Sequence, residues 1–288
     1  MGIRRRGFLK LLGMTGMTLA VGANAVAVPD IDKEEEFNGI LYDSTRCVDC
    51  RTCEEVCAES HKLPVPLPSD KIAAIRKTDE TCNTVVNTYQ TKKGEVYIKR
   101  QCMHCNEPAC AAACLTKAML KTKSGPVTWD ADKCMGCRYC MISCPFDSPK
   151  FEYHSANPKI QKCDMCFERL KTEKSPACAA NCPNEALLYG KRRELIQVAR
   201  RRIYEKPDLY VEHIYGEHEA GGTGWLYLSP VSFDQLGMNI SLQQTSYPSL
   251  TKGFLYTVPS VFVLVPTLLL GIYQASKNNH LNPEKEDE

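Results

Sequence analysis

The sequence has almost no net charge, which already excludes one large class of functions. Its 288 residues contain 36 Lys and Arg against 34 Asp and Glu, so the formal net charge is only +2. Proteins that bind DNA or RNA through phosphates present a strongly basic surface, and this balance argues against such binding. The bias typical of disordered chains is also missing, because 43% of the residues are hydrophobic and 24% are charged. The chain is long enough for one large or two small domains with a buried core.

Catalytic motifs are missing as well. No pair of carboxylates and no nucleophile with a partner base stands out in the sequence. The glycines within residues 221–224 lack the G-x-G-x-x-G spacing of a nucleotide-binding loop and lead into a strand-like segment at 225–228, so we interpret them as a turn. These absences favour a protein that performs no substrate chemistry of its own.

Cysteine is what the sequence has in excess. There are 17 cysteines in the chain, or about 6% of its residues, more than an ordinary globular protein of this length carries. Sixteen of them fall into four consecutive groups of four. The groups are Cys47, Cys50, Cys53 and Cys57; Cys102, Cys105, Cys110 and Cys114; Cys134, Cys137, Cys140 and Cys144; and Cys163, Cys166, Cys178 and Cys182.

The spacing within the groups indicates iron–sulfur chemistry. The first and third groups read C-x2-C-x2-C-x3-C, the second has four residues in its middle gap, and the fourth has eleven. In bacterial two-cluster ferredoxins three cysteines at this spacing bind one cubane, and the fourth ligates another cluster. Zinc needs one tetrahedron of four thiolates, commonly two C-x2-C pairs, and remains the weaker alternative. Because every group keeps four cysteines, we predict four [4Fe-4S] clusters and no three-iron centre.

Two residues near the groups need a separate interpretation. Cys82 is the seventeenth cysteine, and we interpret it as a buried or free thiol. His104 lies between Cys102 and Cys105, but Rieske-type ligation requires two histidines in place of two cysteines, and no cysteine is missing here. We therefore expect His104 behind the ligands or at the surface.

The N-terminus resembles a twin-arginine export signal. Arg5 and Arg6 are followed by Gly7, Phe8, Leu9 and Lys10, then by an uncharged apolar stretch, and small residues near Ala25 offer a cleavage site. The alternative is a retained N-terminal anchor. Because the twin-arginine route exports folded proteins, clusters inserted in the cytoplasm could survive export. We therefore expect residues 1–27 to be a signal peptide.

Near the C-terminus, residues 254–273 contain no charge. Twenty residues at 1.5 Å per residue match a hydrocarbon core of about 30 Å, so the segment predicts a transmembrane helix. Pro259 and Pro266 would kink it. The alternative is a buried core helix. With an export signal at the other end, the expectation is a body on the periplasmic face of the cytoplasmic membrane, anchored by this helix, and an acidic tail at 274–288 on the cytoplasmic side.

Residues 41–228 resemble the four-cluster ferredoxin-like electron-transfer subunits of membrane-bound respiratory oxidoreductases. These subunits serve formate dehydrogenases, dimethyl sulfoxide (DMSO), polysulfide and tetrathionate reductases, and one class of [NiFe] hydrogenase. The segments LYDSTRCVDC, YIKRQCMHC, CMGCRYCMISCP and YGEHEAGGTGWLYL are most similar to the ferredoxin-type subunit of hydrogenase 2. An export signal together with a C-terminal helix agrees with that choice.

The resemblance also implies how the groups pair, with the first and fourth sharing two clusters and the second and third sharing two. The implied ligand sets are Cys47, Cys50, Cys53 and Cys182 for cluster a; Cys163, Cys166, Cys178 and Cys57 for cluster b; Cys102, Cys105, Cys110 and Cys144 for cluster c; and Cys134, Cys137, Cys140 and Cys114 for cluster d. Leu115 follows Cys114 where the family pattern has proline. The partners implied are the small and large hydrogenase subunits and a polytopic quinone-reactive membrane subunit.

The expected fold is α+β, with two pseudo-symmetric bacterial-ferredoxin-like modules of two [4Fe-4S] clusters each and sparse secondary structure, plus the C-terminal transmembrane helix. The four-cluster domain is expected at 39–190, with an extension at 191–252. Its expected elements are strands at 95–99 and 126–129, short helices after each terminal cysteine, and a helix at 191–206 with one apolar face. Residues 58–101 are expected to form a long connection, either an insert that faces a partner or a solvated loop.

Overall fold

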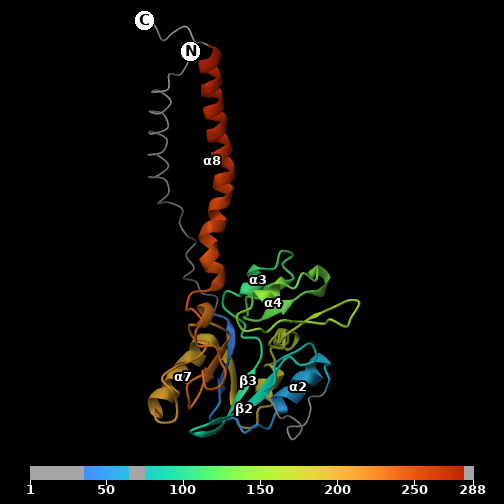
Figure 1. Cartoon of the computed structure of the whole chain (residues 1–288). Coiled ribbons are helices and arrows are strands. Elements are labelled where there is room, and N and C mark those ends of the chain that lie inside the picture. Colours follow the sequence, from blue (N-terminus) through green and yellow to red (C-terminus); the bar gives the residue numbers. More distant parts are fainter. Residues whose placement is uncertain (1–35, 65–74, 282–288) are drawn as a thin grey trace. The chain divides into compact units, whose positions relative to one another are not determined.

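The computed structural model describes residues 36–64 and 75–281, with side chains to residue 277. Contacts divide the chain into a folded body, Glu35–Leu250, and a second unit that includes residues 251–281. Figure 1 shows the elements of both. The expected signal peptide and the last part of the expected acidic tail, residues 282–288, lie outside the described residues.

A three-stranded sheet lies in the body, in the order β8-β1-β9. β1 (Asn38–Asp43) pairs antiparallel with β8 (Leu187–Lys191) and parallel with β9 (Trp225–Leu228). The strand expected at 225–228 is confirmed. Because β9 comes from beyond residue 190, the C-terminal extension folds as part of the body.

Successive side chains of β1 face two different apolar cores, as the two-residue period of a strand requires. Ile40 and Tyr42 pack in one core with Trp225, whereas Leu41 packs in a second core with Leu226. These five side chains are at most 1% exposed, so β1 is buried on both faces.

The two faces of this sheet are covered by different elements. α7 (Arg192–Glu205) buries Leu195 and Ala199 in the second core, which confirms the expected helix and its inward apolar face. The hairpin of β2 (Val85–Thr91) and β3 (Gly94–Arg100) contributes to the first core. Figure 1 labels α7 and both strands of the hairpin in the lower part of the body.

A third core lies under the second and third cysteine groups and contains Cys110, Met119, Val127, Cys140 and Ile160. Two short antiparallel pairs frame it, β4 with β5 and β6 with β7. The strands are β4 (Met119–Lys121), β5 (Val127–Trp129), β6 (Lys150–Phe151) and β7 (Ile160–Gln161). The helices and turns around the cores are α2 (Thr52–His61), α3 (Ala109–Ala112), η3 (Ala131–Lys133), α4 (Tyr139–Ile142), α5 (Phe167–Lys171), α6 (Ala177–Ala180) and η4 (Glu219–Gly221).

One expectation about local structure is wrong. Short helices do not follow the terminal cysteines: α3, α4 and α6 each contain the third cysteine of a group and end before the fourth, and α2 contains both. In its described part, the connection at 58–101 includes the last turn of α2 and the hairpin, whose Val96 and Ile98 pack in the first core and are not solvated. The strands expected at 95–99 and 126–129 are confirmed as β3 and β5.

α8 (Tyr247–Leu281) is a single helix of 35 residues that continues through Pro259 and Pro266. Its apolar part, Tyr247–Lys277, is long enough and apolar enough to cross a membrane. The most apolar stretch of this part is not buried, so within the described chain it is not a core helix. The helix is longer than the apolar segment at 254–273 and includes the first part of the expected tail.

Candidate metal centres

Each cysteine group bends the backbone at the same place. The residue just before the second cysteine has a positive φ in all four groups: Asp49 (53°), His104 (50°), Gly136 (71°) and Met165 (57°). In the first and third groups the residue after the second cysteine is left-handed as well, namely Arg51 and Arg138. This conformation is uncommon for residues other than glycine. The repeat in cysteine spacing is therefore also a repeat in backbone structure.

The helices that carry the third cysteines pack in two pairs. α2 packs against α6, and α3 packs against α4. The first cysteine group consequently lies against the fourth, and the second lies against the third.

One hollow in the body is lined by four cysteines from the two ends of the cysteine-rich segment, together with Tyr42. These are Cys47, Cys50, Cys53 and Cys182. The Tyr42 hydroxyl donates a hydrogen bond to the carbonyl oxygen of Tyr97 at 2.7 Å and also interacts with the Cys47 thiol. Burial raises the pKa of Cys47, and the hydrogen bond with Tyr42 opposes that rise. Four thiols therefore converge on one space.

A second set joins the fourth group to the end of the first. Burial raises the pKa of Cys178 to about 11, and the neighbouring sulfurs of Cys166 and Cys57 contribute to that rise. Burial also raises the pKa of Cys163, and Cys57 is again among the causes. Cys57 thus lies within electrostatic reach of Cys163, Cys166 and Cys178, three of the four cysteines of the fourth group.

His61 and Asp164 hold these two groups together. The Nε2 atom of His61 lies 2.7 Å from a carboxylate oxygen of Asp164, and Nδ1 lies 2.8 Å from the carbonyl oxygen of Cys57. The hydrogen bond with Asp164 is the main cause that raises the pKa of His61, to about 11. The last residue of α2 is thereby joined to the loop of the fourth group.

A third set joins the second group to the end of the third. Burial raises the pKa of Cys105, and the sulfurs of Cys102, Cys144 and Cys110 raise it further. Burial raises the pKa of Cys110 to about 12. Cys144 belongs to the third group in sequence but lies beside the second.

The fourth set joins the third group to the end of the second. Burial raises the pKa of Cys140 to about 11, and the sulfurs of Cys134, Cys114 and Cys137 add to the shift. Burial alone would raise the pKa of Cys114, but hydrogen bonds from the Met119 amide and other nearby groups hold its pKa below the ordinary value. Cys114 therefore lies with the third group, although it ends the second.

This donor set fits iron–sulfur clusters. All seventeen cysteines lie in the described residues, and all are free thiols. Burial disfavours a bare thiolate, so deprotonation of so many buried thiols requires a bound cation. Thiolates are the ligands that iron–sulfur clusters take.

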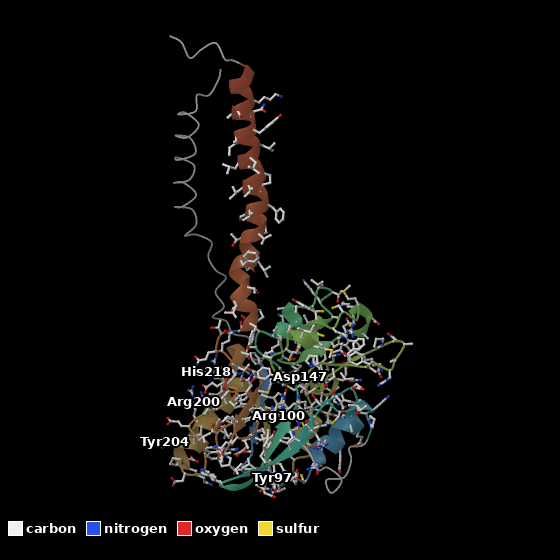
Figure 2. The ribbon with its side chains drawn as sticks, viewed as in Figure 1. Tyr97, Arg100, Asp147, Arg200, Tyr204 and His218 are labelled. Atoms are coloured by element: carbon white, nitrogen blue, oxygen red, sulfur yellow. The ribbon has the colours of Figure 1, made fainter. Side chains whose placement is uncertain are left out.

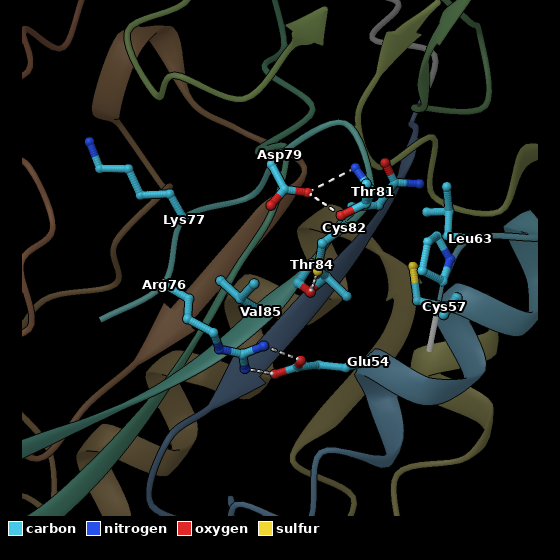
Figure 3. A pocket seen from close by; sticks show the side chains of 13 residues that line it. Glu54, Cys57, Leu63, Arg76, Lys77, Asp79, Thr81, Cys82, Thr84 and Val85 are labelled. Atoms are coloured by element: carbon cyan, nitrogen blue, oxygen red, sulfur yellow. Dashed lines mark hydrogen bonds and ion pairs between the residues drawn. The ribbon is translucent and has the colours of Figure 1, made fainter. Parts of the chain in front are cut away.

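Cys82 stands apart from the four sets. Its S–H donates to the carbonyl oxygen of Thr84 at 2.9 Å, and burial raises its pKa to about 11. Figure 3 shows it on the wall of a cavity of about 530 Å³, where Arg76 pairs with Glu54. A half-buried thiol agrees with its interpretation from the sequence.

His104 is not at the surface, contrary to one of the two expectations for it. The side chain is fully buried, and its Nδ1 accepts a hydrogen bond from the backbone amide of Val127 at 2.8 Å. Burial, assisted by the charges of Lys162 and Lys121, lowers its pKa well below the ordinary value. His104 is therefore a neutral residue that fixes the position of β5.

Sequence interpretation missed the lysines beside the cysteines. Lys99 and Lys162 are buried, and Lys162 donates to the carbonyl oxygen of Cys163 at 3.0 Å. Lys121 donates to the carbonyl oxygen of His104 at 3.0 Å. Lysines are rarely buried, and Lys99 lies in β3 between Ile98 and Arg100, so no local pattern indicated its burial.

Comparisons with known proteins place the chain in a family. Residues 94–192 match the family described as "4Fe-4S dicluster domain". The hydrogenase-2 operon protein HybA of Escherichia coli O157:H7 is 33% identical over 283 residues, which cover 84% of this chain and 86% of HybA. The chain belongs to this family of iron–sulfur electron-transfer subunits. The family predicted from the cysteine motifs is confirmed.

Of two further relatives, one is more similar in sequence to this chain than HybA is, and the other is less similar. A Nitratidesulfovibrio vulgaris protein, whose name states no function, is 45% identical over 284 residues, or 95% of this chain and 77% of that protein. The iron-sulfur subunit of the nitrate-inducible formate dehydrogenase of Escherichia coli K12 is 28% identical over 197 residues, or 65% of this chain and 66% of that subunit. The chain is accordingly an electron-transfer subunit of an oxidoreductase complex and not its catalytic subunit.

Proposed function

We propose that this protein carries electrons through four [4Fe-4S] clusters between a periplasmic [NiFe] hydrogenase and a quinone-reactive membrane subunit. The observation that carries the proposal is the convergence of sixteen free thiols into four sets. The similarity to HybA along most of both chains supports the choice of hydrogenase.

The proposed ligand sets are clusters a to d as the family resemblance implies them. The contacts of α2 with α6 and of α3 with α4 support two modules of two clusters each. The position of Cys144 beside Cys105, and of Cys114 beside Cys140, supports the crossed fourth ligand in the second module. The shared left-handed residue before each second cysteine supports a pseudo-symmetric origin of the loops.

Each cluster, when bound, takes up and releases one electron. The residues of this chain supply the thiolates, bury them and exclude water, which keeps the surroundings from rearranging when the charge changes. Burial is uneven, because the Cys50 and Cys137 residues are exposed whereas Cys57, Cys102, and Cys163 are buried. Electrons can therefore enter and leave most readily beside the first and third loops.

The proposed location follows from both ends of the chain. The twin-arginine motif at Arg5 and Arg6 supports export of the folded protein. The exposed apolar length of α8 supports a membrane anchor. The body would then lie on the periplasmic face of the cytoplasmic membrane.

Purification of the intact protein with its partners tests the choice of complex. We expect nickel, hydrogen-dependent reduction of an artificial dye, and hydrogen-dependent reduction of quinone. Formate or DMSO activity without nickel and without hydrogen oxidation would reject the hydrogenase assignment. It would instead support the second candidate, the same relay in a formate dehydrogenase or a sulfur or sulfoxide reductase, which the similarity to the formate dehydrogenase subunit favours.

A further inference from the structure

Lys99 is a lysine inside the protein, with a relative exposure of 1%. From β3, its ammonium donates to the hydroxyl of Thr84 and to the side-chain oxygen of Gln101 at 3.2 Å, and it lies 5.0 Å from the ring centroid of Trp225. In the described part of the chain, no carboxylate forms an ion pair with it. A buried ammonium among neutral partners is costly unless a negative charge compensates it.

The compensating charges are cysteine sulfurs. Burial acts to lower the pKa of Lys99, but the thiolates of Cys178, Cys53, Cys163 and Cys57 outweigh it, so the pKa stands above its ordinary value. The geometry agrees, because Trp225, which the ammonium of Lys99 faces at 5.0 Å, packs in the first core with Cys178 and Cys53.

The four sulfurs belong to two different ligand sets. Cys53 belongs to cluster a, whereas Cys57, Cys163 and Cys178 belong to cluster b. The ammonium of Lys99 lies over Trp225, whose core includes Cys178 and contacts Cys53, so one fixed positive charge lies beside sulfurs of both sets. The hairpin thus has a role beyond covering the sheet.

We propose that Lys99 is a buried countercharge shared by clusters a and b, and that it raises the reduction potential of both. The inference rests on the proposed function, since it requires the clusters. A [4Fe-4S] cluster with four thiolates is negatively charged, and reduction adds one more negative charge. A fixed cation in a low-dielectric interior stabilises the reduced form more than the oxidised form. Three of the four sulfurs belong to cluster b, so its potential responds more strongly.

The test is a redox titration of the full-length protein in its complex, followed by low-temperature EPR, with iron and sulfide measured on each sample. Lys99→Met removes the charge and keeps the side-chain length. Lys99→Arg retains the charge. Lys93→Met is the matched control, because Lys93 lies in the turn of the same hairpin, is exposed, and donates to the carbonyl oxygen of Asp208.

In Lys99→Met we expect the equilibrium constant for reduction of cluster b to fall by about tenfold or more, a shift of about 59 mV or more for one electron, with a smaller shift in cluster a. Lys99→Arg should restore most of the shift, and Lys93→Met should show none. If Lys99→Met fails to retain iron, Lys99→Gln removes the charge while keeping a hydrogen-bond donor, and the same shift is expected.

Unchanged potentials in a neutral variant that retains its iron would overturn the role of Lys99 while leaving the relay intact. An equal shift in Lys93→Met would overturn it as well, because the effect would then follow net charge. A wild-type protein without iron would instead reject the proposed function itself.

Discussion

The guanidinium of Arg202 donates to the carboxylate of Asp43 at 2.7 Å, and Asp43 is fully buried. The same carboxylate accepts hydrogen bonds from the hydroxyl of Tyr210 at 2.9 Å and from the hydroxyl of Thr45 at 2.6 Å. Asp43 ends β1, and Arg202 lies in the last turn of α7. This ion pair fastens the C-terminal extension to the strand that precedes the first cysteine group.

Arg202→Leu is therefore expected to destabilise the body by about 3–5 kcal/mol, because it leaves the buried carboxylate of Asp43 without its cation. Arg200→Leu is the control in the same helix. Its side chain is 65% exposed and pairs with Glu217, so the expected loss is about 0–1 kcal/mol. Figure 2 labels Arg200 on α7. Denaturant unfolding of the two variants checks this, and equal losses would contradict the role of the Asp43 pair.

Cys144→Ser should damage cluster c more than cluster d, because the thiol of Cys144 lies beside Cys105 and Cys102. Cys82→Ser is the matched control and should leave all four clusters in place, since Cys82 contacts the Thr84 carbonyl and lies outside the four sets. EPR of the reduced protein distinguishes the clusters. Loss confined to the signal of cluster d would show that the fourth ligand does not cross between groups.

The ion pair of His213 and Glu219 predicts a pH dependence of stability. Their atoms approach to 2.7 Å, and the hydrogen bond with Glu219 is the main cause that raises the pKa of His213. Burial opposes ionisation of Glu219, but His213 and the amide of Gly216 outweigh it and lower its pKa. The histidine contribution is complete below about pH 6.5 and is lost as pH rises through the raised pKa. The glutamate contribution is complete above about pH 4.5 and is lost as pH falls through the lowered pKa.

His213→Gln should therefore lower the melting temperature most between about pH 4.5 and 6.5. At more alkaline pH the difference from wild type should shrink. Thermal unfolding followed at several pH values measures it, and a difference that stays constant with pH would contradict this account.

Sequence patterns predicted part of the fold and of the cysteine site, and there are physical reasons why the rest was not predicted. The cysteine spacing indicated which thiols serve metal, and alternating or helical apolar patterns located β3, β5, α7 and β9. Helices such as α3 and α4, with four residues each, are too short to produce a periodic pattern. The parallel pairing of Ile40 with Trp225 joins distant parts of the chain, and no local signal encodes it.

The burial of Lys99 was not predicted from the sequence either. Lys99 lies between Ile98 and Arg100 in β3, but burial of a lysine depends on the thiols that approach it from other elements. A buried lysine beside the cysteines can be recognised only once the folded arrangement of the cysteine groups is known.

Removal of the chain from Lys252 onward should release the body from the membrane, because α8 is the apolar helix of the described chain that is long enough to cross a bilayer. In the proposed hydrogenase complex, hydrogen-dependent dye reduction should survive, whereas hydrogen-dependent quinone reduction should fail. Separation of the membrane and soluble fractions, with both activities assayed in each, tests this prediction. A truncated protein that stays in the membrane fraction without its partners would contradict an anchoring role for α8.

The proposal that this chain holds four [4Fe-4S] clusters is tested by the iron and acid-labile sulfide content of the protein purified without oxygen, combined with Mössbauer spectroscopy. We predict about sixteen iron atoms and about sixteen sulfides per chain, all in cubane clusters. About four zinc atoms with no sulfide would contradict it and would indicate a zinc-stabilised scaffold instead.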